Sequence, residues 1–201
     1  MITQSVAYAQ LSIPFGEFKL AEDLLVAEQC CWVDHVNEND YQGKWDVLPL
    51  NVPKEYVDGH PLLQSFMLEP ECAWVYGPNL TYLPAFKSLL GSLKCDILSA
   101  RLMRLYPHSS IKPHRDIGLS IEKSAQVRIH FCLACSADVE FCVDGQQVPM
   151  VANTCWYINA DAVHSVKNKG QLPRINLVVD CVANQWIYNL LGASVNAAEV
   201  S

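Results

Sequence analysis

The second half of the chain is a succession of short strand-like runs with only turn residues between them. The runs occupy about 85 residues and are rich in β-branched and aromatic side chains. Asp144-Gly145 between two of them is a strong hairpin signal. This pattern predicts a mainly β fold, a jelly roll or double-stranded β-helix of the cupin kind. The expected strands are Ile97–Tyr106, Ile111–His114, Gln126–Ala134, Val139–Val143, Gln147–Val151, Thr154–Ile158, His164–Val166 and Arg174–Val182.

The first 95 residues differ in character and contain the expected N-terminal helices. Apolar residues at three- and four-residue steps predict an amphipathic helix over Glu17–Val33, and a second helix is expected over Pro84–Leu93. Trp45–Leu50 is typical of a strand, whereas the prolines and glycines between Asn51 and Pro78 predict loops. We expect the helices to pack on one face of the β structure.

The length of 201 residues suits one domain with its own hydrophobic core. We expect residues 1–201 to form a single domain, with a helical, loop-rich N-terminal part at 1–95, a β-helix core at 96–186 and a tail at 187–201. A short helix is expected from Trp186 to Leu191.

Composition excludes several classes of protein. Hydrophobic residues make up 51% of the chain and charged residues 17%, which is typical of a compact globular protein. The net charge is -7 and Lys and Arg form no cluster, so we expect no nucleic-acid partner. No apolar run approaches the roughly 18 residues of a membrane span, and Met1–Gln10 does not resemble a signal peptide. We expect a soluble cytoplasmic protein without a membrane partner.

The nine cysteines form no recognisable framework. Their number is odd, and the single CxxC, Cys132 and Cys135, has no second pair at a zinc-site distance. We interpret them as buried reduced thiols, since free cysteine behaves as a small hydrophobe.

His114, Asp116 and His164 are the strongest candidates for chemistry. A histidine and a carboxylate two residues apart on an extended segment point to the same side, and His164 can join them if the chain returns beside the first strand. Two imidazoles and one carboxylate on one face of a metal is the arrangement of non-haem Fe(II) oxygenases. Arg174 is a permanent cation that could clamp a carboxylate through two parallel hydrogen bonds.

Alternation places further polar side chains on inward faces of the predicted strands. Arg128 and His130 share one face of their strand, as do Arg174 and Asn176, with aliphatic or aromatic residues on the other. Arg101 is expected to point inward and Arg104, on the same strand, outward. A cation or imidazole inside a barrel requires a partner. An interior with several arginines therefore predicts a pocket for anions.

Four stretches of sequence resemble a known family: Ala100–Asp116, Val127–His130, Trp156–His164 and Arg174–Asp180. They are similar to the aspartyl/asparaginyl β-hydroxylases, 2-oxoglutarate-dependent oxygenases that include bacterial free-amino-acid hydroxylases of the proline cis-hydroxylase kind. The resemblance covers roughly residues 97–186. The combination of four motifs at these intervals is specific, whereas the HxD motif alone would not be.

The resemblance implies a double-stranded β-helix that holds Fe(II) through His114, Asp116 and His164. It implies that Arg174 binds the distal carboxylate of 2-oxoglutarate and that His130 also contacts this co-substrate. Arg128 matches a position that lines the substrate or co-substrate pocket. The animal peptide hydroxylase has glycine at the position of Asp116, a membrane anchor and a helical-repeat domain. The full triad and the absence of those parts favour a small substrate.

The resulting hypothesis is a dioxygenase that uses Fe(II), 2-oxoglutarate and O₂, with ascorbate as a stimulant. It would hydroxylate an unactivated C–H bond of an amino acid or an amino-acid-derived small molecule and release succinate and CO₂. One alternative is hydroxylation of Asp, Asn or another residue within a peptide. Another is a non-catalytic cupin-like metal- or ligand-binding protein, which would not need Arg174.

Other residues have a plainer interpretation. Arg128 and His130 could be only a structural polar pair, whereas Arg101 is favoured for substrate binding. We expect Asp180 to have a structural role, Trp45, Trp74 and Trp156 to belong to the core, and His35, His60 and His108 to lie at the surface. The sequence indicates neither the oligomeric state nor the role of residues 37–83.

Overall fold

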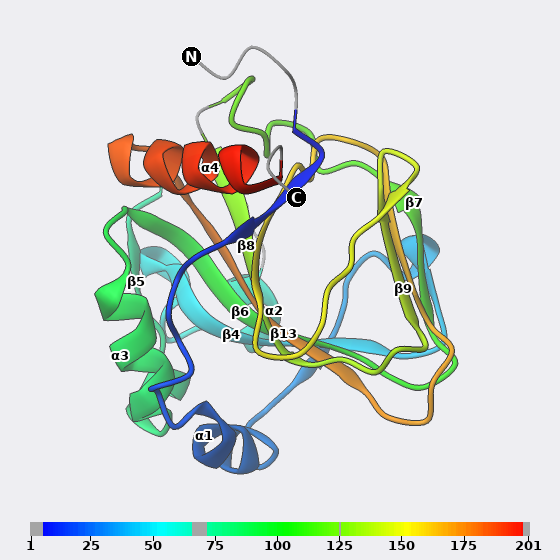
Figure 1. Ribbon diagram of the computed structural model, residues 1–201. Helices are drawn as coiled ribbons and strands as arrows, with labels where there is room; N and C mark the ends of the chain where they lie inside the picture. The colour runs from blue at the N-terminus through cyan, green and yellow to red at the C-terminus, as the bar shows by residue number, and fades with distance from the viewer. Residues whose placement is uncertain (1–5, 66–71, 125, 199–201) are drawn as a thin grey trace.

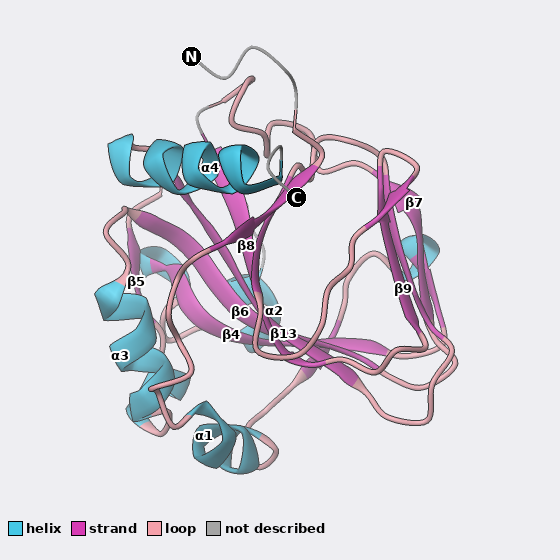
Figure 2. Ribbon diagram, in the orientation of Figure 1, coloured by secondary structure: helices cyan, strands magenta, loops and turns pink. Residues whose placement is uncertain are grey.

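The computed structural model describes residues 6–65, 72–124 and 126–198. Two antiparallel sheets face each other across the molecule (Figures 1 and 2). The mainly β, double-stranded β-helix fold is confirmed. The eight-stranded sheet has the order β1 (Tyr8–Leu11), β11 (Cys155–Ile158), β8 (Gln126–Ala134), β13 (Arg174–Val182), β6 (Ile97–Leu105), β4 (Trp45–Pro53) and β2 (Val33–Asp34), with β5 (Trp74–Tyr76) paired to β4. The five-stranded sheet has the order β10 (Gln146–Gln147), β9 (Val139–Val143), β12 (His164–Asn168), β7 (Ser110–His114) and β3 (Tyr41–Gln42).

Several strands have the predicted bounds and others differ for local reasons. The strands at Gln126–Ala134, Val139–Val143 and Arg174–Val182 begin and end as expected. The strand predicted over Gln147–Val151 is reduced to Gln146–Gln147. Pro149 follows closely and has no N–H to donate to a ladder, so pairing cannot continue through it.

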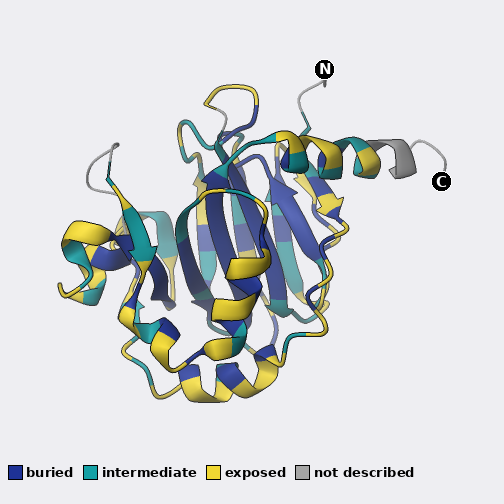
Figure 3. Ribbon diagram, turned by 90° about the vertical axis from the view of Figure 1, so that its left-hand side faces the viewer, coloured by how far each residue is buried: buried dark blue, intermediate teal, exposed yellow. Residues whose placement is uncertain are grey.

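Helices cover the outer face of the large sheet. They are α1 (Leu20–Ala27), α3 (Pro84–Ser92) and α4 (Gln185–Ala198), whose apolar residues join one core with the sheet, whereas α2 (Pro61–Ser65) packs against β4 and adds no residue to that core. In Figure 3 the helices lie over buried strands and turn their exposed residues outward. N-terminal helices therefore pack on one face as expected, and the C-terminal α4 joins them.

The helix predicted over Glu17–Val33 is too long. It ends at Ala27, where the indole Nε1 of Trp32 donates a hydrogen bond to the Ala27 carbonyl at 2.8 Å and the chain turns into β2. The helix predicted to end at Leu191 instead continues to Ala198. The N-terminal part contributes β1 to β5 as well as helices.

The large sheet separates an apolar core from a polar interior. Leu102, Phe131 and Leu177 point to the helix side and are fully buried with Phe86 of α3. Burying each such side chain contributes about 1.5–3 kcal/mol. The alternate positions on β8 and β13 point between the sheets and carry Arg128, His130, Arg174, Asn176 and Asp180. All five of these side chains are buried. The predicted alternation is thus confirmed.

Candidate active site

His114, Asp116 and His164 meet at one end of the small sheet. β12 pairs with β7 so that His164 lies directly opposite His114, and their ring centroids are 4.2 Å apart. Asp116 follows β7, and its backbone N–H donates to the Ala160 carbonyl at 2.8 Å. One ligand atom from each of the three side chains lies within 4.8 Å of the others. The three groups are close enough to bind one metal ion.

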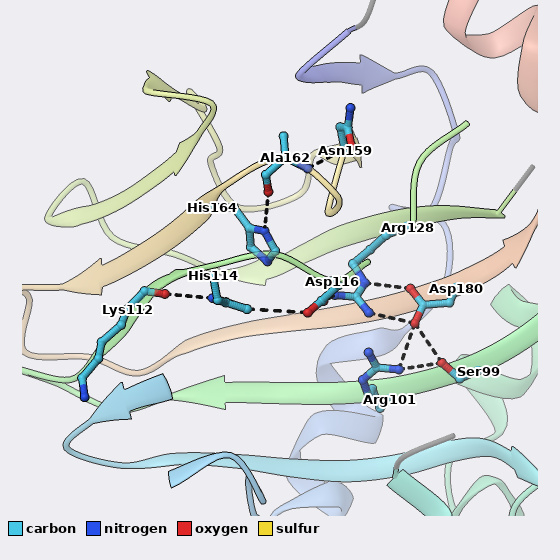
Figure 4. Close-up of polar contacts among 10 residues, drawn as sticks. All are labelled: Ser99, Arg101, Lys112, His114, Asp116, Arg128, Asn159, Ala162, His164 and Asp180. Atoms are coloured by element: carbon cyan, nitrogen blue, oxygen red, sulfur yellow. Dashed lines mark hydrogen bonds and ion pairs between the residues drawn. The ribbon is translucent and has the colours of Figure 1, made fainter. Parts of the chain in front are cut away.

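Hydrogen bonds orient both imidazoles for metal binding. Nδ1 of His114 lies 2.8 Å from the Lys112 carbonyl, and Nδ1 of His164 lies 3.0 Å from the Ala162 carbonyl (Figure 4). A carbonyl can only accept, so each Nδ1 carries the proton and each Nε2 keeps its lone pair. Burial, with His114 adjacent, lowers the pKa of His164 to about 4, so this ring is neutral near neutral pH. The donor set therefore fits a ferrous ion.

The two oxygens of Asp116 have different neighbours. Oδ1 lies 3.8 Å from His114 Nε2, whereas Oδ2 accepts a hydrogen bond from Nη1 of Arg128. Burial raises the pKa of Asp116, but the Arg128 guanidinium together with the two neighbouring histidines more than offsets this, so the pKa lies below its ordinary value. Asp116 is consequently a carboxylate with one oxygen left for a metal.

Asp180 is the centre of a buried network behind this carboxylate. Arg128 donates to it through Nε at 2.7 Å and Nη2 at 3.0 Å. Arg101 donates to Asp180 from Nη1 at 3.1 Å, and Ser99 Oγ donates at 3.1 Å. Figure 4 shows the two arginines approaching Asp180 from different sides. Burial raises the pKa of Asp180, but the two guanidinium groups lower it well below its usual value.

Arg174 lies at the other end of the inward face of β13. It is 4% exposed, its Nε is buried without an acceptor, and it forms no ion pair within the described residues. Burial lowers its pKa, as expected for a cation without a carboxylate partner. Its guanidinium lies 5.2 Å from the centre of the Phe141 ring. A dicarboxylate such as 2-oxoglutarate would supply the missing anion.

His130 is neutral beside Arg174. Burial and the charge of Arg174 hold the pKa of His130 well below its ordinary value. With the Asn176 amide oriented to satisfy its neighbours, its oxygen accepts from Arg174 Nη2 at 2.8 Å and from His130 Nδ1 at 3.1 Å. Asn176 therefore links the two residues that the sequence assigned to the co-substrate.

All seven residues selected from the sequence line one cavity of about 350 Å³. Arg104 points to the opposite face of β6, as the alternation along the strand predicted. It donates to Asp46 through Nε at 3.0 Å and through Nη2 at 2.8 Å. The cavity is lined by His114, Asp116, His164, Arg174, His130, Arg128 and Arg101.

Several cavity residues were missed or misjudged. The prediction that His35 lies at the surface is wrong: it is buried and stacks on Trp45 with ring centroids 3.6 Å apart. Trp45 and Trp156 belong to the buried core as expected, and Trp45 also lines the cavity. Trp74 was expected in the core but is only partly buried and lines the cavity. His60 and His108 are exposed as predicted. The long-range contact between His35 and Trp45 has no local sequence signal.

Comparison with known proteins identifies the family. The family model described as "Aspartyl/Asparaginyl beta-hydroxylase" matches residues 21–184. The chain belongs to the aspartyl/asparaginyl β-hydroxylase family. It is accordingly a 2-oxoglutarate-dependent non-haem iron oxygenase, and family membership implies iron and 2-oxoglutarate as its cofactor and co-substrate. This argues against the non-catalytic cupin-like alternative.

Solved structures resemble this β-hydroxylase family member in fold at low sequence identity. An oxidoreductase of the 2OG-Fe(II) oxygenase family from Burkholderia pseudomallei has a TM-score of 0.58 and 13% identity, covering 89% of this chain and 88% of its own. The non-haem α-ketoglutarate-dependent epimerase SnoN of nogalamycin biosynthesis has a TM-score of 0.52 and 13% identity, covering 88% and 78%. A prolyl-4-hydroxylase from Pseudomonas putida has a TM-score of 0.50 and 13% identity, covering 89% and 93%.

No match was found among curated proteins. Within the described ranges, no helix is long and apolar enough to cross a membrane.

Proposed function

We propose that this β-hydroxylase family member hydroxylates an unactivated C–H bond of an amino acid or an amino-acid-derived small molecule. His114, Asp116 and His164 would hold the ferrous ion, each through one atom. When bound, iron supplies the oxidising chemistry that couples decarboxylation of 2-oxoglutarate to hydroxylation of the substrate. The overall reaction consumes O₂ and 2-oxoglutarate and gives the hydroxylated product, succinate and CO₂.

One observation carries this proposal: a metal-binding triad and an unpaired buried arginine share one cavity. Arg174 would bind the distal carboxylate of 2-oxoglutarate, and His130 would help to position the co-substrate. Arg128 holds the second oxygen of Asp116, which leaves the first for the metal. The protein residues thereby orient the reactants before any bond is broken.

The size of the cavity supports a small substrate. Its volume of about 350 Å³ lies near the lower end of the range for ligand pockets, which is about 300–1,000 Å³, and it must also hold the co-substrate. The alternative is hydroxylation of Asp, Asn or another residue within a peptide. In that case only one side chain of the peptide would enter the cavity.

The test is turnover with Fe(II), 2-oxoglutarate and ascorbate. We expect ascorbate to stimulate the enzyme. Amino acids and short peptides would be screened for succinate and for a product heavier by one oxygen atom. We expect a free amino acid or a derivative to give both products. His114→Ala and His164→Ala should abolish metal binding and turnover. Succinate at background level with every candidate, or activity in either variant close to that of the unmodified enzyme, would contradict the proposal.

We also propose that residues 1–201 act as one catalytic domain in the cytoplasm. No disulfide joins the cysteines of the described residues, which is typical of a reducing compartment. Purification of the protein with and without reductant would test the proposed location, since a native disulfide would contradict a reducing compartment.

A further inference from the structure

The strand ladder that holds His114 ends before it reaches Asp116. β7 ends at His114, which is the last residue of this strand to pair with β12 and lies opposite His164. Asp116 follows the ladder, so strand pairing does not fix the position of this side chain relative to His164. Contacts outside the ladder therefore have to hold the three side chains at distances that suit one metal ion.

The turn that precedes His164 supplies such contacts. The Ala160 carbonyl accepts a hydrogen bond from the backbone N–H of Asp116 at 2.8 Å. The Ala162 carbonyl lies 3.0 Å from Nδ1 of His164, as Figure 4 shows. Asp161 lies between these two carbonyl groups in the chain. The turn therefore contacts both segments that supply the metal-binding triad.

Asp161 also binds the residue between His114 and Asp116. Arg115 donates from Nε to the Asp161 carbonyl at 2.5 Å and from Nη2 to Asp161 Oδ1 at 2.9 Å. Neighbouring side chains of an extended segment point to opposite sides, so Arg115 leaves the side that His114 and Asp116 share. Arg115 is not among the described residues that line the cavity. Its two hydrogen bonds consequently fix the rotation of this segment from outside the cavity.

The carboxylate of Asp161 is held between two cations. Its side chain is 2% exposed, whereas those of Arg115 and Lys123 are 48% and 59% exposed. Lys123 Nζ lies 2.5 Å from Oδ2, so each carboxylate oxygen has its own cation. The backbone N–H of Asp161 donates to the Leu119 carbonyl at 3.2 Å. A buried carboxylate is costly unless it is paired, so Asp161 holds Arg115 on one side and the loop with Lys123 on the other.

Given the proposed function, we propose that Asp161 is a positioning residue for the metal site and acts through Arg115. It holds the segment that carries His114 and Asp116 against the turn that orients the imidazole of His164. Asp161 itself supplies no ligand atom, because the described side chains that are close enough to share a metal ion are those of the triad. Without the contact between Arg115 and Asp161, the three ligands no longer keep the separation that one ion requires, and metal affinity falls.

The test measures anaerobic Co(II) binding to the metal-free protein, followed by the Co(II) absorption spectrum. Asp161→Ala should weaken Co(II) binding by about 10–100-fold, as loss of a group that orients a metal ligand does, and should shift the absorption bands. Arg115→Ala removes the same contact at a more exposed position and should weaken Co(II) binding at least as much, which provides a second variant if Asp161→Ala does not fold. The double variant should bind Co(II) within about threefold of Arg115→Ala, because residues that act through one contact are not additive.

Control variants separate positioning of the ligands from stability of the loop. Lys123→Ala removes the other cation from Asp161 and should leave the affinity for Co(II) within about threefold of that of the unmodified protein. Asp161→Asn keeps an acceptor for Arg115 and should recover most of the affinity that Asp161→Ala loses. Urea denaturation of each metal-free variant measures its stability separately, since a merely structural role would lower stability without changing the Co(II) affinity or spectrum of the folded protein.

Two results would overturn the proposal. One is a Co(II) affinity and spectrum in folded Asp161→Ala or Arg115→Ala equal to those of the unmodified protein. The other is a loss of affinity in Lys123→Ala as large as that in Arg115→Ala. Failure of the unmodified protein to bind Co(II) would instead contradict the proposed function on which the inference rests.

Discussion

At the scale of single residues, unpaired charge is the feature that points to ligands. Most buried charges in this protein are paired, as Arg104 is with Asp46. Arg174 is buried without a carboxylate, which would normally be destabilising. Such a residue is understandable if a ligand supplies the anion.

Substitution of Arg174 should therefore weaken the binding of 2-oxoglutarate. Arg174→Ala removes the proposed partner of the distal carboxylate, and we expect the KM for 2-oxoglutarate to rise at least 100-fold. Steady-state kinetics with varied 2-oxoglutarate would measure this. Arg174→Lys is the matched variant, because it keeps the positive charge but loses the paired N–H donors of the guanidinium. Its KM for 2-oxoglutarate should lie between those of the unmodified enzyme and Arg174→Ala. A KM for Arg174→Ala equal to that of the unmodified enzyme would refute the assignment.

At the scale of elements, the N-terminus of α3 is capped by a side chain from α1. Buried Asp23 accepts hydrogen bonds at Oδ2 from the backbone N–H groups of Ala85 at 2.8 Å and Phe86 at 3.0 Å. The residue that precedes α3, Leu83, has no capping side chain. Asp23 thus joins two helices that cover the large sheet.

Asp23→Ala should lower the free energy of unfolding by about 1–2 kcal/mol, because two helix N–H groups lose their acceptor. Asp23→Asn keeps an acceptor and should lose less. Urea denaturation would measure both, with exposed Glu22→Ala as the control on the same helix, expected to change stability by no more than about 0.5 kcal/mol. Equal effects of the Asp23 and Glu22 substitutions would show that the cap contributes nothing.

Many strand bounds and inward-facing positions follow from the local alternation of polar and apolar residues. The exceptions have physical causes. Strict alternation fixed the bounds of β8 and the inward positions of Arg128 and His130. The same alternation from Arg174 and Asn176 would have placed Asp180 inside, although we expected only a structural role for it. The burial of His35 could not have been predicted, because it depends on stacking of this residue, just after β2, against Trp45 of β4.

At the scale of the whole molecule, buried neutral histidines couple folding to pH. Burial lowers the pKa of His35 to about 3 and that of His130 well below its ordinary value. In the unfolded chain both have a pKa of about 6.5. As the pH falls below that value the unfolded chain takes up protons that the folded protein does not, so stability decreases.

Between pH 7 and 5, the free energy of unfolding of the metal-free protein should therefore fall as the pH is lowered. Each such histidine contributes up to about 1.4 kcal/mol per pH unit below its unfolded pKa. Urea denaturation at pH 7, 6 and 5 would measure the slope, and His35→Asn should reduce it. A stability that is constant over this range would contradict the burial of these two rings as neutral groups.

The central claim is that His114, Asp116 and His164, from two neighbouring strands and the loop after one of them, bind a single ferrous ion. The most direct measurement is an anomalous difference map at the iron absorption edge, from crystals grown anaerobically with Fe(II) and 2-oxoglutarate. The account predicts one peak in contact with Nε2 of both histidines and Oδ1 of Asp116, and no peak in His164→Ala crystals. A peak at another site, or none in the unmodified protein, would contradict it.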